Sequence, residues 1–304
     1  MCRFLVYKGR AILMADLITR PEHSIIKQSY DSRERKESST LPARLNADGF
    51  GVAWFAEEGD DPSPCVFTST LPAWNNKNLV RLCDKIISQV VFAHIRAASI
   101  GSTVTEANCH PFCFGRYVFM HNGHLAGFGR MKRRMIQDLR EDIFLSIQGT
   151  TDSEHAFAVF LDELSRIRDC QTFLEPQSPQ VLLQALKNTL FRIKCLSQSL
   201  GIQGHSYLNF ALSDGNSVLA SRVLLNPVQN PELAPASLYY SCGTEFKNLA
   251  PSVYRMAQRD RLEEVVIISS ERLTLAQEDW MEVPRNSILM VNASFNVTLH
   301  AFPA

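Results

Sequence analysis

Apolar positions along the chain divide it into early strands, middle helices and late strands. Short apolar or alternating runs are typical of strands, and in the first half they occur at residues 2–7, 49–55, 90–97 and 115–123. A helix is predicted over residues 75–89, where leucines and isoleucines recur at helical spacing. The late strands are predicted at residues 207–225 (a hairpin turning at 214–216), 237–243, 263–271, 287–292 and 296–302.

Two middle helices are marked by the residues at their ends. The first, over residues 151–164, is expected to begin at a cap formed by Asp152 or Ser153, with acidic side chains in its first turn. The second, over residues 178–201, has Pro179 near its start and Gly201 beyond its end. These features predict two well-defined helices between the two groups of strands.

This order of elements predicts an α+β protein in which helices cover two sheets. A Rossmann fold is not favoured, because strands and helices do not alternate and the chain has no GxGxxG or Walker motif. The charge run at residues 31–39 and the polar stretch at 57–64 are expected to be loops.

Composition narrows the class of protein. Apolar residues make up 45% and charged residues 20% of the 304 positions, as in ordinary globular proteins. Lysine plus arginine and aspartate plus glutamate are both 31, so no nucleic acid or anionic membrane partner is expected. No apolar run is long enough to span a bilayer and no signal peptide is evident, so we expect a cytoplasmic protein whose eight cysteines are free.

Cysteine at position 2 is the first candidate for chemistry. Removal of Met1 would give Cys2 a thiol and a free amine on the same residue. A free thiol has a pKa of about 8.5 and needs a base near neutral pH. An α-amine, with a pKa of about 7.7–8, can be that base. The alternative is that this cysteine has no role, since any residue can follow the first methionine.

Further polar candidates lie at strand ends and at a helix start. Asn122 and Gly123 offer an amide and a backbone N–H that can bind an oxyanion, although Asn-Gly is also typical of a hairpin turn. Arg96 can bind a carboxylate or form a structural ion pair. Asp152 can bind an ammonium group or cap a helix. Arg96 and Asp152 together would recognise both charged groups of an amino acid.

A metal site is the rival hypothesis for the segment NCHPFC. It holds Cys109, His110 and Cys113, with more histidines nearby, but a fourth ligand at zinc-like spacing is missing. We therefore predict no metal and no cofactor, and we expect His110 to shape a turn by side-chain hydrogen bonding. A serine hydrolase is not favoured, because the chain has no GxSxG motif.

Six motifs in this order resemble the class II glutamine amidotransferases, which are N-terminal nucleophile hydrolases. The motifs are MCR, NADGFGVAW, FAHIRAAS, NCHPF, FMHNG and TDSEHAF, from residue 1 to about 160. The late segment VIISSERLT resembles the stand-alone members, which include the YafJ type, the amidohydrolase of ergothioneine synthesis and a subunit of the eukaryotic glutathione-degrading complex. The resemblance implies a four-layer αββα sandwich formed by residues 1–304 as one domain, with the motifs in about 1–160 and closing helices and strands in about 161–304.

The resemblance also implies roles by position. The expected catalytic residues are Cys2, as nucleophile with its own α-amine as base, and Asn122 and Gly123, as oxyanion hole. The expected substrate-binding residues are Arg96 for the α-carboxylate, Asp152 for the α-amine, Ser99 near that carboxylate, and His121.

Two departures from the amidotransferases joined to a synthetase change the substrate end of the expected pocket. Leu45-Asn46-Ala47-Asp48 stands where those members have Arg-Gly before the turn, and Ala97 stands where they have tryptophan. These departures put free glutamine in doubt as the substrate, so a bulkier γ-glutamyl compound is the alternative and the leaving group stays open.

The expected activity follows from this resemblance and from the length of the chain. Within these 304 residues we expect no separate acceptor domain. We therefore expect hydrolysis of a γ-glutamyl amide through a thioester, with release of glutamate. The alternatives are a glutaminase supplying ammonia to a partner subunit, in a glutathione-degrading or amidotransfer complex, and a non-catalytic binding protein on the same fold.

Overall fold

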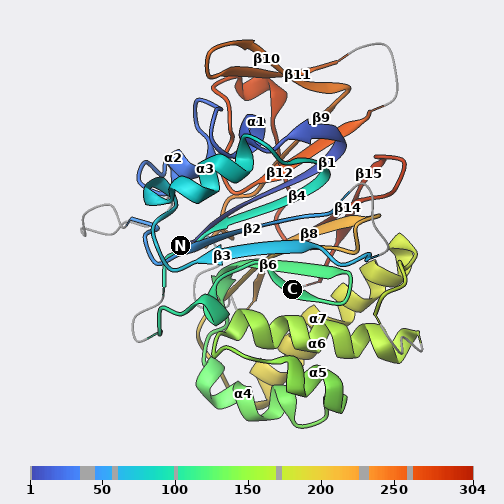
Figure 1. Cartoon of the computed structure of the whole chain (residues 1–304). Coiled ribbons are helices and arrows are strands. Elements are labelled where there is room, and N and C mark those ends of the chain that lie inside the picture. The colour runs from blue at the N-terminus through green and yellow to red at the C-terminus, as the bar shows by residue number, and fades with distance from the viewer. Residues whose placement is uncertain are drawn as a thin grey trace.

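Two antiparallel sheets packed face to face form the centre of the molecule (Figure 1). The computed structural model describes residues 2–34, 45–56, 61–98, 102–168, 173–225, 233–258 and 263–303. In this part of the chain, the first sheet has the order β13 (Met281–Glu282), β9 (Tyr239–Gly243), β12 (Val265–Ser269), β1 (Arg3–Leu13), β4 (Ile87–Ile95), β2 (Phe50–Trp54) and β3 (Cys65–Ser69). The second has the order β15 (Val297–Ala301), β14 (Ser287–Val291), β8 (Val218–Leu225), β7 (Ser206–Ser213), β6 (Tyr117–His124) and β5 (Phe112–Phe114).

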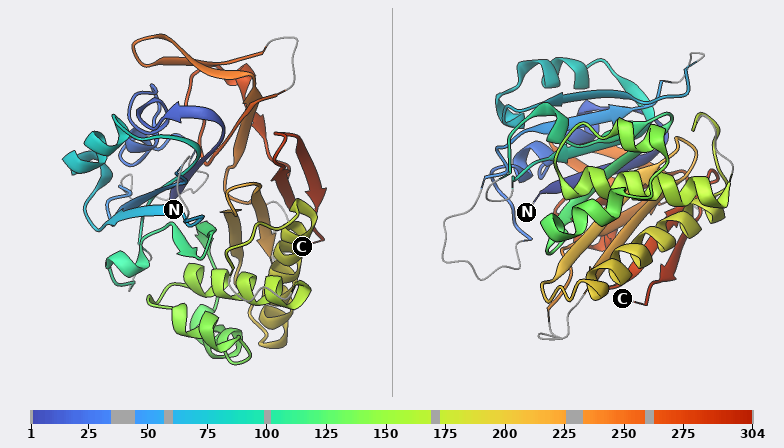
Figure 2. Two further views of the ribbon diagram at one scale, coloured as in Figure 1. Left: turned by 45° about the vertical axis from the view of Figure 1, so that its right-hand side comes forward. Right: turned by 90° about the horizontal axis from the view of Figure 1, so that it is seen from below.

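Helices cover the outer face of each sheet and complete four layers (Figures 1 and 2). The first sheet carries α1 (Ala15–Ile18), α2 (Ile25–Gln28) and α3 (Lys77–Cys83). The second carries α4 (Phe128–Ile136), α5 (Glu141–Ser146), α6 (Asp152–Ile167) and α7 (Pro179–Ser199). A hairpin of β10 (Glu245–Ala250) and β11 (Val253–Ala257) lies at the end of the molecule away from α4–α7 (Figure 2). The predicted α+β αββα sandwich is confirmed.

The apolar runs of the sequence arise because the central strands are buried on both faces. Along β1, Phe4 and Val6 pack in the core between the two sheets, whereas Leu5 and Tyr7 pack beneath α1–α3. In β6, Val118 and Met120 belong to the same inner core, and the alternate side chains face α6 and α7. Burial of apolar surface in three stacked cores is therefore the main stabilising contribution.

The two long helices begin at hydroxyl caps. The side chain of Thr151 accepts a hydrogen bond from the N–H of Glu154, and that of Ser178 accepts one from Val181. The prediction that Asp152 or Ser153 caps α6 is therefore wrong by one or two residues, because the helix already includes both. The predicted second helix is confirmed, with its proline in the first turn and Gly201 at a φ of +59° after its end.

Other predicted elements differ from the structure in extent. The helix expected over residues 75–89 ends at Cys83, since Ile87 already begins β4. Strand β3, the β10–β11 hairpin, and helices α4 and α5 were not predicted, because they are short or largely polar on their exposed faces. Residues 35–44 and 57–60, in or beside the predicted loops, lie outside the described residues. None of the helices described here has the length and hydropathy needed to cross a bilayer.

Candidate functional site

A cavity of about 480 Å³ opens where β1 begins, β4 and β6 end, and α6 starts. The predicted site residues that line it are Cys2, Arg96, His121, Gly123 and Asp152. The side chain of Asn122 is directed instead towards Ser270, at the end of β12. Ser99 lies outside the described residues. The fold thus gathers five of the seven predicted residues around one cavity.

The thiol of Cys2 is held next to the end of β4. Strands β1 and β4 pair with Arg3 opposite Ile95, which brings Cys2 beside Ala97. The N–H of Ala97 donates to Cys2 Sγ at 3.3 Å, and Sγ lies 3.6 Å from the Ala97 carbonyl oxygen. These two contacts fix the position of the sulfur at the end of β4. Cys2 is half-buried and lines the cavity.

The guanidinium of Arg96 is buried without an acidic partner. Its Nη2 donates to Ser102 Oγ at 3.0 Å and to the Thr103 carbonyl at 3.1 Å, and its Nη1 donates to the Asp48 carbonyl at 3.4 Å. Arg96 is only 3% exposed, yet no carboxylate in the described residues forms an ion pair with it. Buried charges are normally paired, so this guanidinium is suited to the carboxylate of a ligand.

Asp152 supplies the opposite charge to the cavity. It is the first residue of α6, and its carboxylate accepts hydrogen bonds from the Leu125 N–H at 2.7 Å and from Ser153 Oγ at 3.2 Å. A helix N-terminus stabilises a negative charge. A carboxylate has about four acceptor positions, so capacity is left for an ammonium group. A cavity that holds Arg96 and Asp152 matches the zwitterionic head of an α-amino acid.

The NCHPF segment joins the two charged sides of the cavity. Asn108 Nδ2 donates to Thr103 Oγ1 at 2.9 Å and to Thr150 Oγ1 at 3.2 Å, and Asn108 Oδ1 accepts from the Thr150 N–H at 2.8 Å. Thr103 contacts Arg96, and Thr150 lies two residues before Asp152. Sequence reasoning noted this segment but missed that role, because two of these bonds join Asn108 to Thr150, 42 positions away in the chain.

Gly123 lies within a strand and not in a hairpin turn. Asn122 pairs with Asn209, and Gly123 pairs with Leu208, in the β6–β7 ladder. The hairpin-turn interpretation of this Asn-Gly pair is therefore wrong. Gly123 has a φ of 157°, and a Cβ at this position would collide with the Tyr207 carbonyl oxygen. Glycine is required because the backbone approaches β7 so closely.

The amide of Asn122 is buried and only partly bonded. Its Nδ2 lies 3.2 Å from Ser270 Oγ, and its Oδ1 has no hydrogen-bond partner among the described residues. Ser270 Oγ already accepts a bond from the Phe4 N–H at 3.0 Å, so its own hydroxyl proton is available to donate. Rotating the amide by half a turn would let Oδ1 accept that proton and would free Nδ2 to donate elsewhere.

His121 borders the cavity, but protein atoms already engage both of its ring nitrogens. Its Nδ1 lies 2.9 Å from Ser153 Oγ, and its Nε2 lies 2.8 Å from the Tyr207 carbonyl oxygen. Burial lowers the pKa of His121, although the nearby Asp152 carboxylate opposes that effect. The ring is therefore neutral at neutral pH and ties β6 to α6 and β7.

Two further buried histidines pack against each other, and one of them, His110, also lines the cavity. The rings of His94 and His110 lie 4.2 Å apart, and His110 also lies 4.6 Å from the ring of Phe112. Neither ring nitrogen of His110 has a partner in the described part of the chain, so the predicted side-chain hydrogen bond is wrong. Burial lowers the pKa of His94 to about 3 and that of His110 well below its usual range, so both rings are neutral.

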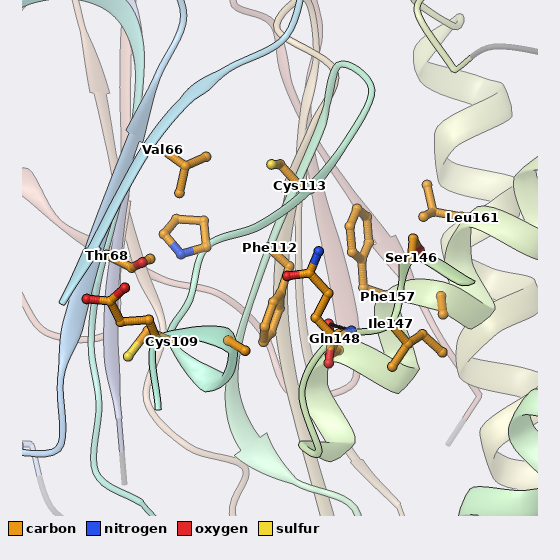
Figure 3. Close-up of a pocket in the computed structure, with 15 residues that line it drawn as sticks. Val66, Thr68, Cys109, Phe112, Cys113, Ser146, Ile147, Gln148, Phe157 and Leu161 are labelled. Atoms are coloured by element: carbon orange, nitrogen blue, oxygen red, sulfur yellow. Dashed lines mark hydrogen bonds between the residues drawn. The ribbon is translucent and has the colours of Figure 1, made fainter. Parts of the chain in front are cut away.

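A second cavity, of about 230 Å³, lies between β3, β5 and the middle of α6 (Figure 3). Cys109 and Cys113 stand at separate corners of it in Figure 3, so their sulfurs do not converge on one point. Burial raises the pKa of the Cys109 thiol to about 11. Among the described residues, no group of three or more histidine, cysteine or acidic side chains is arranged to hold a metal ion. This second cavity contains none of the predicted site residues.

Comparisons with known proteins place this geometry in a family. The profile described as class II glutamine amidotransferases matches residues 28–301. The probable glutamine amidotransferase DUG3 of Saccharomyces cerevisiae is 39% identical over 308 residues, which cover 99% of this chain and 84% of that protein. A γ-glutamyl-hercynylcysteine sulfoxide hydrolase of Mycolicibacterium smegmatis is 30% identical over 123 residues, covering 40% of this chain and 51% of that one.

A solved structure shows the same fold over the full length of both chains. The glutamine aminotransferase class-II domain protein of Silicibacter pomeroyi superposes with a TM-score of 0.63 and 21% sequence identity, covering 100% of each chain. Since the identity is low, this likeness concerns the arrangement of helices and strands. It agrees with the αββα layering of the present structure.

Proposed function

The chain belongs to the class II glutamine amidotransferases, and from that premise we propose that it hydrolyses a γ-glutamyl amide bond with Cys2 as nucleophile. Removal of Met1 gives Cys2 the free α-amine that this chemistry needs. The observation that carries the proposal is the buried guanidinium of Arg96, which has no acidic partner in the described chain and shares a cavity with the Cys2 thiol and Asp152.

Recognition of the glutamyl head follows from the two charges. Arg96 binds the substrate α-carboxylate and Asp152 binds the α-ammonium group, which directs the γ-carbonyl towards Cys2. Ser99, in the segment after Arg96, is assigned to the carboxylate end. His121 contributes by holding β6 against α6, because both of its ring nitrogens already have protein partners.

Acylation then proceeds at the γ-carbon. The α-amine of Cys2 takes the thiol proton, and the sulfur attacks the carbonyl carbon. The resulting oxyanion accepts hydrogen bonds from the Gly123 N–H and from Asn122 Nδ2, turned away from Ser270. One such donor is typically worth about 3 kcal/mol of transition-state stabilisation. When the C–N bond breaks, the leaving amine takes the proton from the α-ammonium group, and a thioester remains.

Deacylation reverses the proton transfers with water in place of the amine. The α-amine accepts a proton from water as the oxygen attacks the thioester, and the same two donors stabilise the second oxyanion. The C–S bond breaks, the thiolate regains a proton from the α-ammonium group, and glutamate leaves. Each proton removed is returned, so Cys2 ends in its starting state.

The size and lining of the cavity favour a leaving group larger than ammonia. Beyond the charged residues, the cavity is lined by His124, Leu125 and Phe128, where β6 leads into α4. Its volume of about 480 Å³ lies within the range of pockets that enclose a whole small-molecule ligand. We therefore propose a glutathione-like γ-glutamyl peptide or amine as the substrate class.

A screen of glutamate release tests this function. Glutamine, γ-glutamylcysteine and glutathione are each incubated with the protein and with a Cys2→Ala variant of the same chain. We expect release from at least one substrate with a bulky leaving group, and none from the variant. Release by glutamine alone would favour the glutaminase alternative, in which a partner subunit receives ammonia. Equal release by the variant would contradict the role of Cys2.

A further inference from the structure

The last residue of β12 and the two residues after it form a segment that contacts both the first residues of the chain and the amide of Asn122. We call residues 269–271 the β12 exit segment. The N–H of Ser270 donates to the Phe4 carbonyl, and the N–H of Phe4 donates to Ser270 Oγ, both at 3.0 Å. Ser270 Oγ is also the atom 3.2 Å from Asn122 Nδ2. One hydroxyl group therefore touches both the strand of the nucleophile and the proposed oxyanion donor.

The next residue of this segment holds the backbone of Cys2 through a buried ion pair. Glu271 Oε1 lies 2.5 Å from Arg3 Nε, and Arg3 Nη1 donates to the Cys2 carbonyl oxygen at 2.8 Å. The exposed fractions of Arg3 and Glu271 are 2% and 0%. Because Arg3 presents several N–H groups in one rigid plane, it can bind the carboxylate and the Cys2 carbonyl simultaneously.

The other carboxylate oxygen of Glu271 is fixed from a second direction. Its Oε2 lies 2.8 Å from His23 Nε2 and accepts the Arg33 N–H at 2.9 Å. Burial alone would raise the pKa of Glu271, but these hydrogen bonds and the charge of Arg3 lower it to about 2. The carboxylate is therefore ionised at neutral pH, and its position is determined by three separate parts of the chain.

Glu271, Arg3 and Ser270 do not line the substrate cavity. They act only through Cys2 and Asn122, which belong to different sheets. A small displacement between a nucleophile and its oxyanion donor strongly slows a reaction, since attack requires near-contact geometry. An element that bonds to both groups therefore sets their relative position.

We propose that the β12 exit segment positions the nucleophile against the oxyanion donor, with Glu271 and Arg3 fixing the Cys2 backbone and Ser270 fixing the Asn122 side chain. This inference rests on the proposed function of Cys2. It assigns a purpose to the Ser-Ser-Glu sequence at the end of a buried strand. It makes Glu271 and Arg3 positioning residues that never touch the substrate.

The variant Glu271→Gln tests the proposal against a matched control. The control is Asp162 in α6, which is also a buried carboxylate but does not line the cavity. It forms ion pairs with Arg166 and Arg192 and accepts a hydrogen bond from the Arg140 N–H. We expect Glu271→Gln to lower kcat roughly tenfold to a hundredfold with KM within about twofold. We expect Asp162→Asn to lower stability and to leave both constants, per folded molecule, within about twofold.

A second variant keeps the charge of Arg3 and removes its planar fork. Arg3→Lys retains a positive charge beside Glu271, but it loses the geometry that reaches the Cys2 carbonyl. We expect a folded protein whose kcat falls roughly tenfold, and whose labelling at Cys2 by the glutamine-like electrophile 6-diazo-5-oxonorleucine slows by a similar factor. The proposal would be overturned if Arg3→Lys and Glu271→Gln both kept the kcat and the labelling rate of the wild type. It would also be overturned if Asp162→Asn lowered kcat as much as Glu271→Gln does.

Failure of this inference is distinguishable from failure of the proposed function. If wild-type protein releases glutamate and Cys2→Ala does not, the function stands whatever the Glu271 and Arg3 variants do. If Cys2→Ala is as active as wild type, the function fails first, and positioning of Cys2 fails with it.

Discussion

Arg96 is the residue whose surroundings say most about the ligand. Oxygen acceptors hold its guanidinium in place, but none of those acceptors carries a charge. A structural arginine at this depth is expected to pair with an acid. Under the proposed function, the α-carboxylate of the substrate supplies the missing negative charge, and this requirement would select amino-acid-like substrates.

The variant Arg96→Lys should therefore weaken substrate binding more than catalysis. Lysine keeps the charge but loses bidentate geometry, so we expect kcat/KM to fall roughly 10- to 100-fold, about 2 kcal/mol, mainly through a higher KM. Steady-state kinetics with the best substrate of the screen measure this effect. Arg166→Lys, at a half-exposed pair on α6, is the control and should behave as wild type. An unchanged KM in Arg96→Lys would argue against the carboxylate site.

The sequence predicts the residues that line this site better than it predicts the residues that hold them in position. Cys2, Arg96 and Asp152 are recognisable because each is a reactive or charged residue at an element end, in an order that resembles a known family. Arg3 and Glu271 are separated by most of the chain and meet only because β1 pairs with β12. No local pattern shows such a pairing, so their ion pair could not be predicted.

At the scale of elements, the start of α6 places one charge of the site. The Thr151 hydroxyl caps the helix, and the next residue, Asp152, is bonded to the Leu125 N–H after β6. Helix α7 begins in the same way at Ser178, which does not line the cavity. The caps of α6 and α7 can therefore be compared directly, because only the cap of α6 lies next to a residue of the candidate site.

Removing each cap in turn distinguishes an effect on protein stability from an effect on substrate binding. Thr151→Ala and Ser178→Ala should each lower the free energy of unfolding by about 1 kcal/mol, since each leaves a helical N–H unpaired. Only Thr151→Ala should also raise KM, because Asp152 loses its fixed backbone. Thermal denaturation and steady-state kinetics on both variants check this. The same KM in the two variants would show that the cap does not position Asp152.

Errors in the predicted elements have physical causes. The Asn-Gly pair of β6 has the sequence of a hairpin turn, but long-range pairing with β7 keeps Asn122 and Gly123 extended. Helical spacing continued past Cys83 because Ile86 and Ile87, just before and at the start of β4, extend the apolar pattern of the helix. Local propensity gave the correct type for most long elements, whereas boundaries and short exposed strands depend on tertiary packing.

At the scale of the whole molecule, packing of two sheets and α6 around the site keeps several buried histidines neutral, among them His94, His110 and His121. His94 lies on β4, His121 lies on β6, and His110 lies between η2 (Glu106–Asn108) and β5. Burial lowers the pKa of each ring. Unfolding exposes these rings to water, where each regains a pKa of about 6.5. The free energy of unfolding therefore depends on pH through histidines in the same layers that form the cavity.

Stability should fall as the pH drops below about 6.5, because the unfolded chain then binds protons that the folded chain does not. Each buried histidine contributes up to about 1.4 kcal/mol per pH unit in this window. Glu271, with a pKa of about 2, adds stability that is present above its usual pKa and is lost as the pH falls towards 2. Both effects lower stability as the pH falls, and the effect of the histidines appears at a higher pH than that of Glu271.

The variant His110→Phe isolates one of these protons. In the wild type, the His110 ring packs against aromatic neighbours. It has no hydrogen bond in the described chain that the substitution would remove. We expect the slope of unfolding free energy against pH, between about pH 6 and 4, to decrease by about 1.4 kcal/mol per unit. Urea unfolding at several pH values measures it, with His124→Phe at an exposed position as control. An unchanged slope would mean that His110 is protonated in the folded state.

The central claim is that Cys2, freed of Met1, forms a thioester with the glutamyl group of its substrate. Intact-mass spectrometry of protein quenched in acid during turnover, followed by peptide mapping, measures this directly. We expect a chain that lacks Met1 and carries one glutamyl group on Cys2, and no such group on the Cys2→Ala variant. An active protein that retains Met1, or a glutamyl group on another residue, would contradict it.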